Sequence, residues 1–216
     1  MAETERLGLK TFNEENRFYN SVYRKGATLL IEQHIPPPPF GGGYDDKSLP
    51  RKEAYFEEGE TLTQLQWCTQ HPPLETEPPA DARRHTMEIL DVVAGGTQKP
   101  AQLVKCQLDG GKEVFMAKIY DPLFHRGYSV DTTFWADSAY SKEAAVYEGI
   151  KRRGDDGRLS PKYHGSWTSN LPVDDASVPA RTRPVRMILM EYIEAPNFAA
   201  ILKEKRQTLL TDQERL

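Results

Sequence analysis

Cysteine is scarce in this chain of 216 residues, which contains only Cys68 and Cys106. The two form no Cys-x-x-Cys pair, so the sequence indicates neither a disulfide framework nor a zinc site. Long apolar runs are also missing, since none approaches the roughly 18 residues that a membrane span requires. The opening segment, MAETERLGLKTF, lacks the apolar core of a secretory signal. We therefore expect an intracellular protein, cytoplasmic or nuclear, that does not engage a membrane.

The chain has no excess of basic residues, because 28 lysines and arginines face 32 aspartates and glutamates, for a net charge of −4. General binding to nucleic acid requires a basic surface, so we expect no nucleic-acid partner. The hydrophobic share of 38% and the mean hydropathy of −0.66 are low for a chain that is folded throughout. These values predict a sizeable unstructured portion.

The first part of the chain, residues 1–86, carries most of the proline and the excess acidity: 9 of the 16 prolines, and 10 basic against 14 acidic residues. The stretches PPPPFGGG (36–43) and HPPLETEPP (71–79) favour polyproline II and open linker. We expect a proline-rich, partly disordered and largely irregular arm, with one helix from about Asn13 to Gln33. The arm is either a spacer or a segment that docks on a protein partner.

The second part, residues 87–216, has the pattern of apolar and polar residues that is typical of a folded domain. Alternating and apolar runs predict strands over 86–93, 102–108, 113–120, 160–168 and 185–193, with a tight turn at Asp109–Gly111. A helix is predicted from about Ser138 to Arg153, capped by Asp137 or Ser138, and a short one after Asn197. The expected fold is α+β: a five-stranded antiparallel sheet with one packed helix.

A lysine stands on one of the apolar strands. In EVFMAKIYDP (113–122), Lys118 lies on the same strand face as Met116 and Tyr120. A buried lysine needs an anion or a path to water. In the predicted helix, Glu143 lies in the middle of an apolar stripe, so each residue would supply the other's counter-ion. The alternative is that Lys118 extends to the sheet edge and Glu143 lies at the border of the stripe.

These segments resemble the N-terminal lobe of the protein-kinase fold over residues 87–216. FMAK (115–118) is similar to the family's Val-Ala-Ile-Lys strand, and SKEAAVYEGI (141–150) to the helix whose glutamate pairs with that lysine. MILMEYIEAPNFAAIL (187–202) is similar to the fifth strand, the hinge and the next helix. The resemblance implies that Lys118 holds ATP phosphates and Glu143 orients it, that Met190 is the gatekeeper, and that Glu191 to Ile193 contact adenine.

The glycine loop departs from the family pattern G-x-G-x-x-G. Gly95 and Gly96, the expected phosphate-loop residues, are adjacent, with Pro100 following. Met116 also replaces the small residue that lines the adenine pocket. With these departures, the sequence resembles divergent kinase-like families, including small-molecule phosphotransferases of similar fold, as much as typical protein kinases.

The catalytic motifs H-R-D-x-x-x-x-N and D-F-G do not occur after Met190. No catalytic residue or metal ligand is therefore assigned, and Mg²⁺ is expected with ATP only if a C-terminal lobe is present. Thr211 and Glu214 have capping-box spacing, typical of the opening of a helix. We expect a chain truncated before the catalytic loop, the alternative being a frayed natural terminus.

Three hypotheses about function follow. The first is the ATP-binding N-lobe portion of a divergent protein-kinase-like phosphotransferase. The second is a non-catalytic, pseudokinase-like interaction module. The third is an unrelated α+β domain in which the charged groups of Lys118 and Glu143 lie apart. His164 is expected to be a strand-edge histidine and Trp167 a packing residue.

Overall fold

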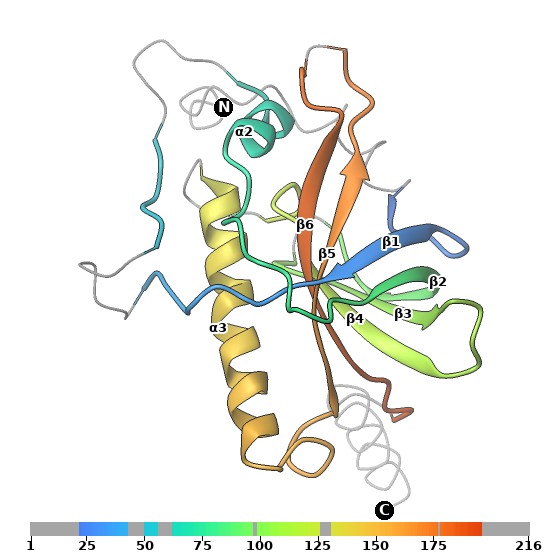
Figure 1. Ribbon diagram of the computed structural model, residues 1–216. Coiled ribbons are helices and arrows are strands. Elements are labelled where there is room, and N and C mark those ends of the chain that lie inside the picture. Colours follow the sequence, from blue (N-terminus) through green and yellow to red (C-terminus); the bar gives the residue numbers. More distant parts are fainter. Residues whose placement is uncertain are drawn as a thin grey trace, which may run out of the picture.

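The computed structural model describes residues 22–42, 50–55, 62–96, 99–125, 131–176 and 178–195. Within these ranges the chain forms six strands and two helices longer than a single turn (Figure 1). They are, in chain order, β1 (Thr28–Gln33), α2 (Gln64–Gln70), β2 (Arg84–Ala94), β3 (Gln102–Leu108), β4 (Val114–Tyr120), α3 (Thr132–Arg152), β5 (Tyr163–Pro172) and β6 (Thr182–Glu191).

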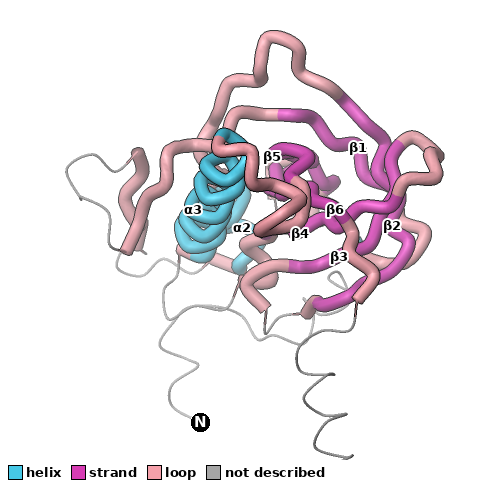
Figure 2. Tube along the Cα trace, turned by 90° about the horizontal axis from the view of Figure 1, so that it is seen from below, coloured by secondary structure: helices cyan, strands magenta, loops and turns pink. Residues whose placement is uncertain are grey.

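The strands form a closed antiparallel barrel in the order β1-β2-β3-β4-β6-β5. Closure depends on β1, which pairs with β2 on one side and with β5 on the other. Ile31, for example, lies opposite His85 in one register and Ser169 in the other. A closed barrel leaves no strand edge unpaired. Figure 2 shows α3 lying along the outside of the strands.

The predicted α+β fold, a kinase-like N-lobe with a five-stranded antiparallel sheet, is therefore wrong: within the described residues the fold is mainly β, with six strands in a closed barrel and two helices. The sixth strand, β1, comes from residues predicted to end a helix. In β1, Leu29 and Ile31 are buried while Thr28 and Leu30 are exposed, which is the alternation of a strand. The apolar pair Leu29–Leu30 also fits a helix, and only the pairing with β2 and β5 resolves that ambiguity.

The other predicted strands are present. The bounds of β3 agree with the prediction, and β4 begins one residue later, at Val114. Asp109 and Gly110 both have positive φ angles, +51° and +68°, as the predicted tight turn requires. β5 and β6 are present with shifted bounds. The helix predicted after Asn197 and the capping box at Thr211 lie outside the described residues.

The interior of the barrel is largely apolar. It is filled by alternate residues of the six strands: Leu29, Ile31, Met87, Ile89, Val104, Cys106, Phe115, Ala117, Ile119, Trp167, Leu171, Val185, Met187 and Leu189. Trp167, predicted to be a packing residue, is only 1% exposed. Burying these side chains is the main source of stability, at about 25 cal/mol per Å² of apolar surface.

Helix α3 begins six residues earlier than the predicted start at Ser138. Its cap is Asp131, whose carboxylate accepts a hydrogen bond from Phe134 N at 2.9 Å. Asp137 does not cap the helix, because it lies inside it, buried, and accepts a hydrogen bond from Leu74 N. The sequence showed polar residues at both positions and could not distinguish a cap from a buried acceptor.

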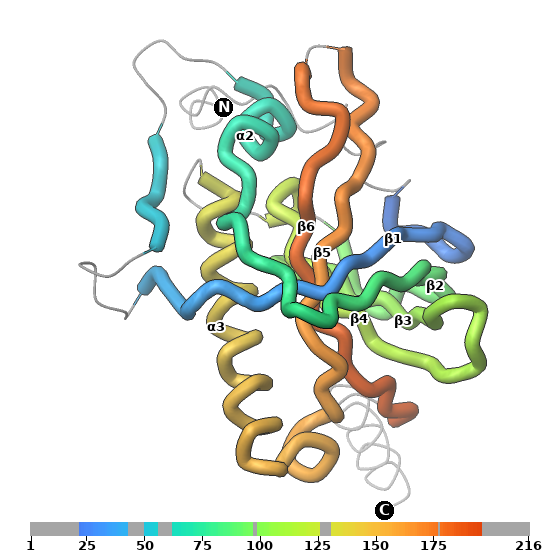
Figure 3. Tube along the Cα trace, viewed as in Figure 1, coloured from blue at the N-terminus to red at the C-terminus, as the bar shows by residue number. Residues whose placement is uncertain are grey.

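The arm predicted over residues 1–86 contains regular structure in β1 and α2, and described parts of it without helix or strand pack against α3. Figure 3 shows the segment after β1, coloured blue, running across that helix. Phe40 is fully buried, and its carbonyl accepts a hydrogen bond from Ser138 Oγ at 2.8 Å. Arg51 binds both carboxylate oxygens of Asp131, at 2.8 and 2.9 Å. The many prolines therefore do not prevent packing.

A buried ion pair joins the end of β4 to β6. Arg183 donates to both carboxylate oxygens of Asp121, at 2.6 and 2.7 Å, and the two side chains are 2% and 0% exposed. Tyr23, which precedes β1, donates a further hydrogen bond to Asp121 at 2.8 Å. This group of three connects the barrel-closing segment to the rest of the sheet.

We predict that Arg183→Met lowers the free energy of unfolding by about 3–5 kcal/mol, because Asp121 would be left buried without its counter-charge. Arg181→Met is the matched control: Arg181 is exposed, two residues away, and should change stability by less than about 0.5 kcal/mol. Urea unfolding followed by circular dichroism measures both. Equal effects of the two substitutions would show that the buried pair contributes no specific stability.

A second prediction concerns the contact between the arm and α3. Gly41 has φ +75°, and a Cβ there would lie 2.5 Å from Ser138 Oγ. Gly26 has a similar φ of +81° with no atom within 4 Å. Gly26→Ala should therefore cost only the backbone strain, about 1–2 kcal/mol, while Gly41→Ala adds about 1–3 kcal/mol of overpacking. Thermal unfolding measures the loss of stability in each variant. Identical losses would show that Gly41 is not packed closely against Ser138 of α3.

Candidate functional site

Lys118 lies on the outer face of the barrel, in the middle of β4. Its Cα faces Leu103 of β3 and Ile188 of β6. Phe115, Ala117 and Ile119 point into the barrel, so the alternating residues, including Lys118, point outward towards α3. The strand is apolar on both sides because one face lines the barrel and the other is covered by the helix.

Lys118 and Glu143 form the predicted ion pair. Lys118 Nζ lies 2.7 Å from one carboxylate oxygen of Glu143 and 2.6 Å from the other. The two side chains are 28% and 29% exposed, so neither is sealed from water. The arrangement neutralises the lysine while leaving its ammonium group within reach of a ligand. It contradicts the alternative in which the two charged groups lie apart.

Tyr120 is a third member of this site that the sequence reasoning did not assign. Its hydroxyl donates to Glu143 Oε2 at 2.5 Å. Burial and the charge of Glu143 raise the pKa of Tyr120 well above its usual value, so it remains a protonated donor. Its position two residues after Lys118, on the same strand face, was the available signal. Tyr120 holds the Glu143 carboxylate from the side opposite solvent.

The helix face that carries Glu143 is buried as predicted. Tyr140 and Ala144 are fully buried, and they pack in one cluster with Ile188 and Met190 of β6. The ring of Tyr140 also meets that of Tyr120 edge to face, with centroids 5.5 Å apart. These contacts fix the rotation of α3, and hence the position of Glu143 above β4.

The predicted hinge begins at Glu191, the last residue of β6, and continues through the two residues after it. Met190 is buried, with its sulfur 3.4 Å from Tyr147 Oη, and it lies beside Met116 in the β4–β6 register. Glu191 N donates to Lys162 O at 2.8 Å. Ile193 is 56% exposed. Met116 and Met190 therefore lie between Lys118 and the exposed Ile193. Their side chains reduce the space in which a planar nucleotide base could bind beside the predicted hinge.

Of the two glycines predicted to cover phosphates, Gly96 is hydrogen-bonded to Gln102 of β3, and Gly95 lies close to the same side chain. Gly96 N donates to Gln102 Oε1 at 2.6 Å, and Gln102 Nε2 donates back to Gly96 O at 3.3 Å. A Cβ on Gly95 would lie 2.6 Å from the same Gln102 oxygen. A phosphate could use the Gly96 N–H only after Gln102 moved away.

Two kinds of feature are absent from the part of the chain that the structure describes. No group of three or more His, Cys, Asp or Glu side chains there is arranged to hold a metal ion. Neither α2 nor α3 combines the length and the apolar character that crossing a membrane would require.

No protein-family model, curated protein or solved structure matches this chain. The closed six-stranded barrel also differs from the kinase-like lobe that the sequence predicts, so the roles considered for Lys118 and Glu143 rest on those residues and their contacts alone.

We predict that Lys118→Met leaves the protein folded. The ion pair is partly solvated, and pairs of that kind contribute about 1 kcal/mol or less. Glu143 also keeps the hydrogen bond from Tyr120 and its access to water. Urea unfolding of the Lys118→Met variant measures the loss, and a value above about 3 kcal/mol would identify the pair as a structural support.

Proposed function

We propose that this chain binds a nucleoside triphosphate, in the manner of the N-lobe of a divergent protein-kinase-like phosphotransferase. Lys118 would bind the phosphates, Glu143 would orient Lys118, and the segment from Glu191 to Ile193 would contact the base. The observation that carries the proposal is the contact of Lys118 Nζ with both Glu143 oxygens at a partly exposed position.

The strand order supports this assignment. β4, which carries Lys118, is the direct neighbour of β6, which leads into the proposed hinge. Ile188 faces Lys118 and Glu191 lies three residues further on, about 10 Å along the strand. The lysine and the hinge are thus separated by the kind of distance that lies between the phosphates and the base of a nucleotide.

Closure of the barrel by β1 does not interfere with the proposal. Within the described sheet, β1 pairs only with β2 and β5. Lys118 lies on β4, and the proposed hinge begins on β6, so the strands next to β1 do not carry these residues. In the described part of the chain, α3 packs over the outer face of β4, as the ion pair requires. Phosphoryl transfer would need an aspartate and Mg²⁺ ligands from a second lobe.

The second candidate function is a non-catalytic interaction module of the pseudokinase type. The bonds between Gly96 and Gln102 favour it, because they occupy a backbone donor that a phosphate would use. Met116 and Met190, side by side, favour it as well, because they fill space beside the proposed hinge. In this case the ion pair would serve only to position α3.

Titration of the full chain with ATP, with and without Mg²⁺, distinguishes the two functions. We expect Lys118→Met to weaken ATP binding by about 10- to 100-fold, the equivalent of one charge-assisted contact of about 1.5–3 kcal/mol. Lys25→Met is the matched control, because Lys25 is exposed and distant in sequence from the site. Isothermal titration calorimetry provides the affinities.

Two results would argue against nucleotide binding at this site: unchanged affinity in Lys118→Met, or no heat of binding in the unaltered chain. If Gln102→Ala then created measurable binding, the Gly96–Gln102 contact would be identified as the block, in agreement with the pseudokinase-type alternative.

A further inference from the structure

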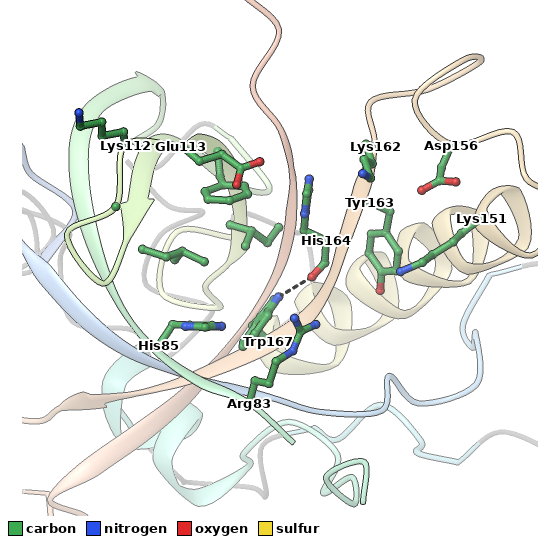
Figure 4. Close-up of a pocket in the computed structure, with 14 residues that line it drawn as sticks. Arg83, His85, Lys112, Glu113, Lys151, Asp156, Lys162, Tyr163, His164 and Trp167 are labelled. Atoms are coloured by element: carbon green, nitrogen blue, oxygen red, sulfur yellow. Dashed lines mark hydrogen bonds between the residues drawn. The ribbon is translucent and has the colours of Figure 1, made fainter. Parts of the chain in front are cut away.

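A hollow of about 480 Å³ lies at one end of the barrel, away from the Lys118–Glu143 pair. Its wall is built by the start of β2, the β3–β4 turn, the start of β5 and the residues around the end of α3 (Figure 4). Neither Lys118 nor Glu143 lines it. The volume is within the range of about 300–1,000 Å³ that small-molecule sites occupy.

The rim of the hollow carries four cations: Arg83, Lys112, Lys151 and Lys162. None of them forms a salt bridge with any described residue. Arg83 is held in place by a hydrogen bond from its Nε to Gln33 at 3.2 Å, and its guanidinium lies 5.9 Å from the ring centre of Trp167. The ammonium group of Lys151 lies in a similar way over Tyr163, with Nζ 5.4 Å from the centre of the ring.

Among the residues that line the hollow, carboxylates are fewer than cations, while Glu148 acts on Tyr163 and Glu191 on His164 from just outside the lining. Glu113 and Asp156 are the two carboxylates in the wall, so the lining keeps a surplus of two positive charges. Glu191 is close by, and its carboxylate accepts a hydrogen bond from Lys162 N at 3.1 Å. His85 also belongs to the wall but is paired with Asp109 at 2.5 Å. The surplus lies with the arginine and the lysines.

The floor of the hollow is apolar and firmly packed. Phe115, Trp167 and Leu189 form it, and all three side chains are buried in the barrel core. His164 stands between floor and rim, with its ring 5.0 Å from that of Phe115. Burial lowers the pKa of His164, so the neutral imidazole can contribute one N–H donor. Trp167 Nε1 is bonded to His164 O at 3.2 Å, the dashed line in Figure 4.

We propose that this hollow binds a small organic anion that combines an aromatic or apolar body with a phosphate or carboxylate group. The body would lie on the floor formed by Phe115, Trp167 and Leu189. Arg83, Lys151 and Lys162 would hold the anionic group at the rim. The rim cations are exposed to solvent, so an anionic group can form charge-assisted hydrogen bonds with them while the apolar body of the same molecule covers the floor. The inference does not depend on nucleotide binding at Lys118.

Three probes test the proposal: 1-naphthyl phosphate, the uncharged 1-naphthol, and inorganic phosphate. Binding is measured by calorimetry on the full chain and by quenching of tryptophan fluorescence. We expect 1-naphthyl phosphate to bind at least tenfold more tightly than either of the other two, because it alone uses both the floor and the rim. Added salt should weaken its binding.

A pair of double variants locates the site. Arg83→Gln with Lys162→Gln removes two rim charges, and we expect at least a tenfold loss of affinity for 1-naphthyl phosphate. Arg181→Gln with Lys25→Gln removes the same charge from exposed positions outside the hollow, and we expect less than a twofold change. All four side chains are exposed, so both proteins should fold, and circular dichroism confirms that they do.

Lys118→Met separates this site from the proposed nucleotide site, and it should leave the binding of 1-naphthyl phosphate unchanged. Loss of that binding in Lys118→Met would overturn the proposal, since the probe would then occupy the other site. Equal binding of 1-naphthol would also overturn it, because charge would play no part. Equal losses of affinity for 1-naphthyl phosphate in the two double variants would also overturn it, because only the net charge of the protein would then matter.

Discussion

The backbone pairing of β1 with both β2 and β5 is the interaction on which the rest of the structure depends. Without it, β2 and β5 would each present an unpaired edge, and the apolar interior would open to water between them. The same six residues draw the N-terminal segment against the barrel. Tyr23, just before β1, then completes the buried group of Asp121 and Arg183. A short strand thus joins parts of the chain that are far apart in sequence.

Closure also determines how α3 is held. One side of the helix packs on β4 and β6, through Tyr140 and Ala144. Its N-terminal half is contacted by the arm, since Asp131 binds Arg51 and Ser138 binds the carbonyl of Phe40. A helix fixed from two sides cannot rotate freely, so Glu143 keeps its place above Lys118. The arm therefore contributes to the geometry of the ion pair without touching it.

The two clusters of charge on this molecule differ in one physical respect. At Lys118 the cation is neutralised by Glu143, and the carboxylate is itself fixed by Tyr120. At the end of the barrel, four exposed cations and two carboxylates line a hollow together with apolar side chains of the core. The first arrangement is stable without a ligand and offers one positioned donor. The second is the one whose electrostatic energy a bound anion would improve.

The sequence by itself determined the local structure wherever apolar residues recurred with a single clear spacing, such as the alternation of a strand. It predicted β3, β4 and the turn at Asp109–Gly110, because strict alternation and a turn dipeptide leave little choice. It also predicted the Lys118–Glu143 pair, because two opposite charges in apolar surroundings need each other. Only the tertiary structure decided that β1 is a strand, that α3 begins after Asp131, and that the arm packs. Those outcomes depend on partners distant in sequence, which no local pattern identifies.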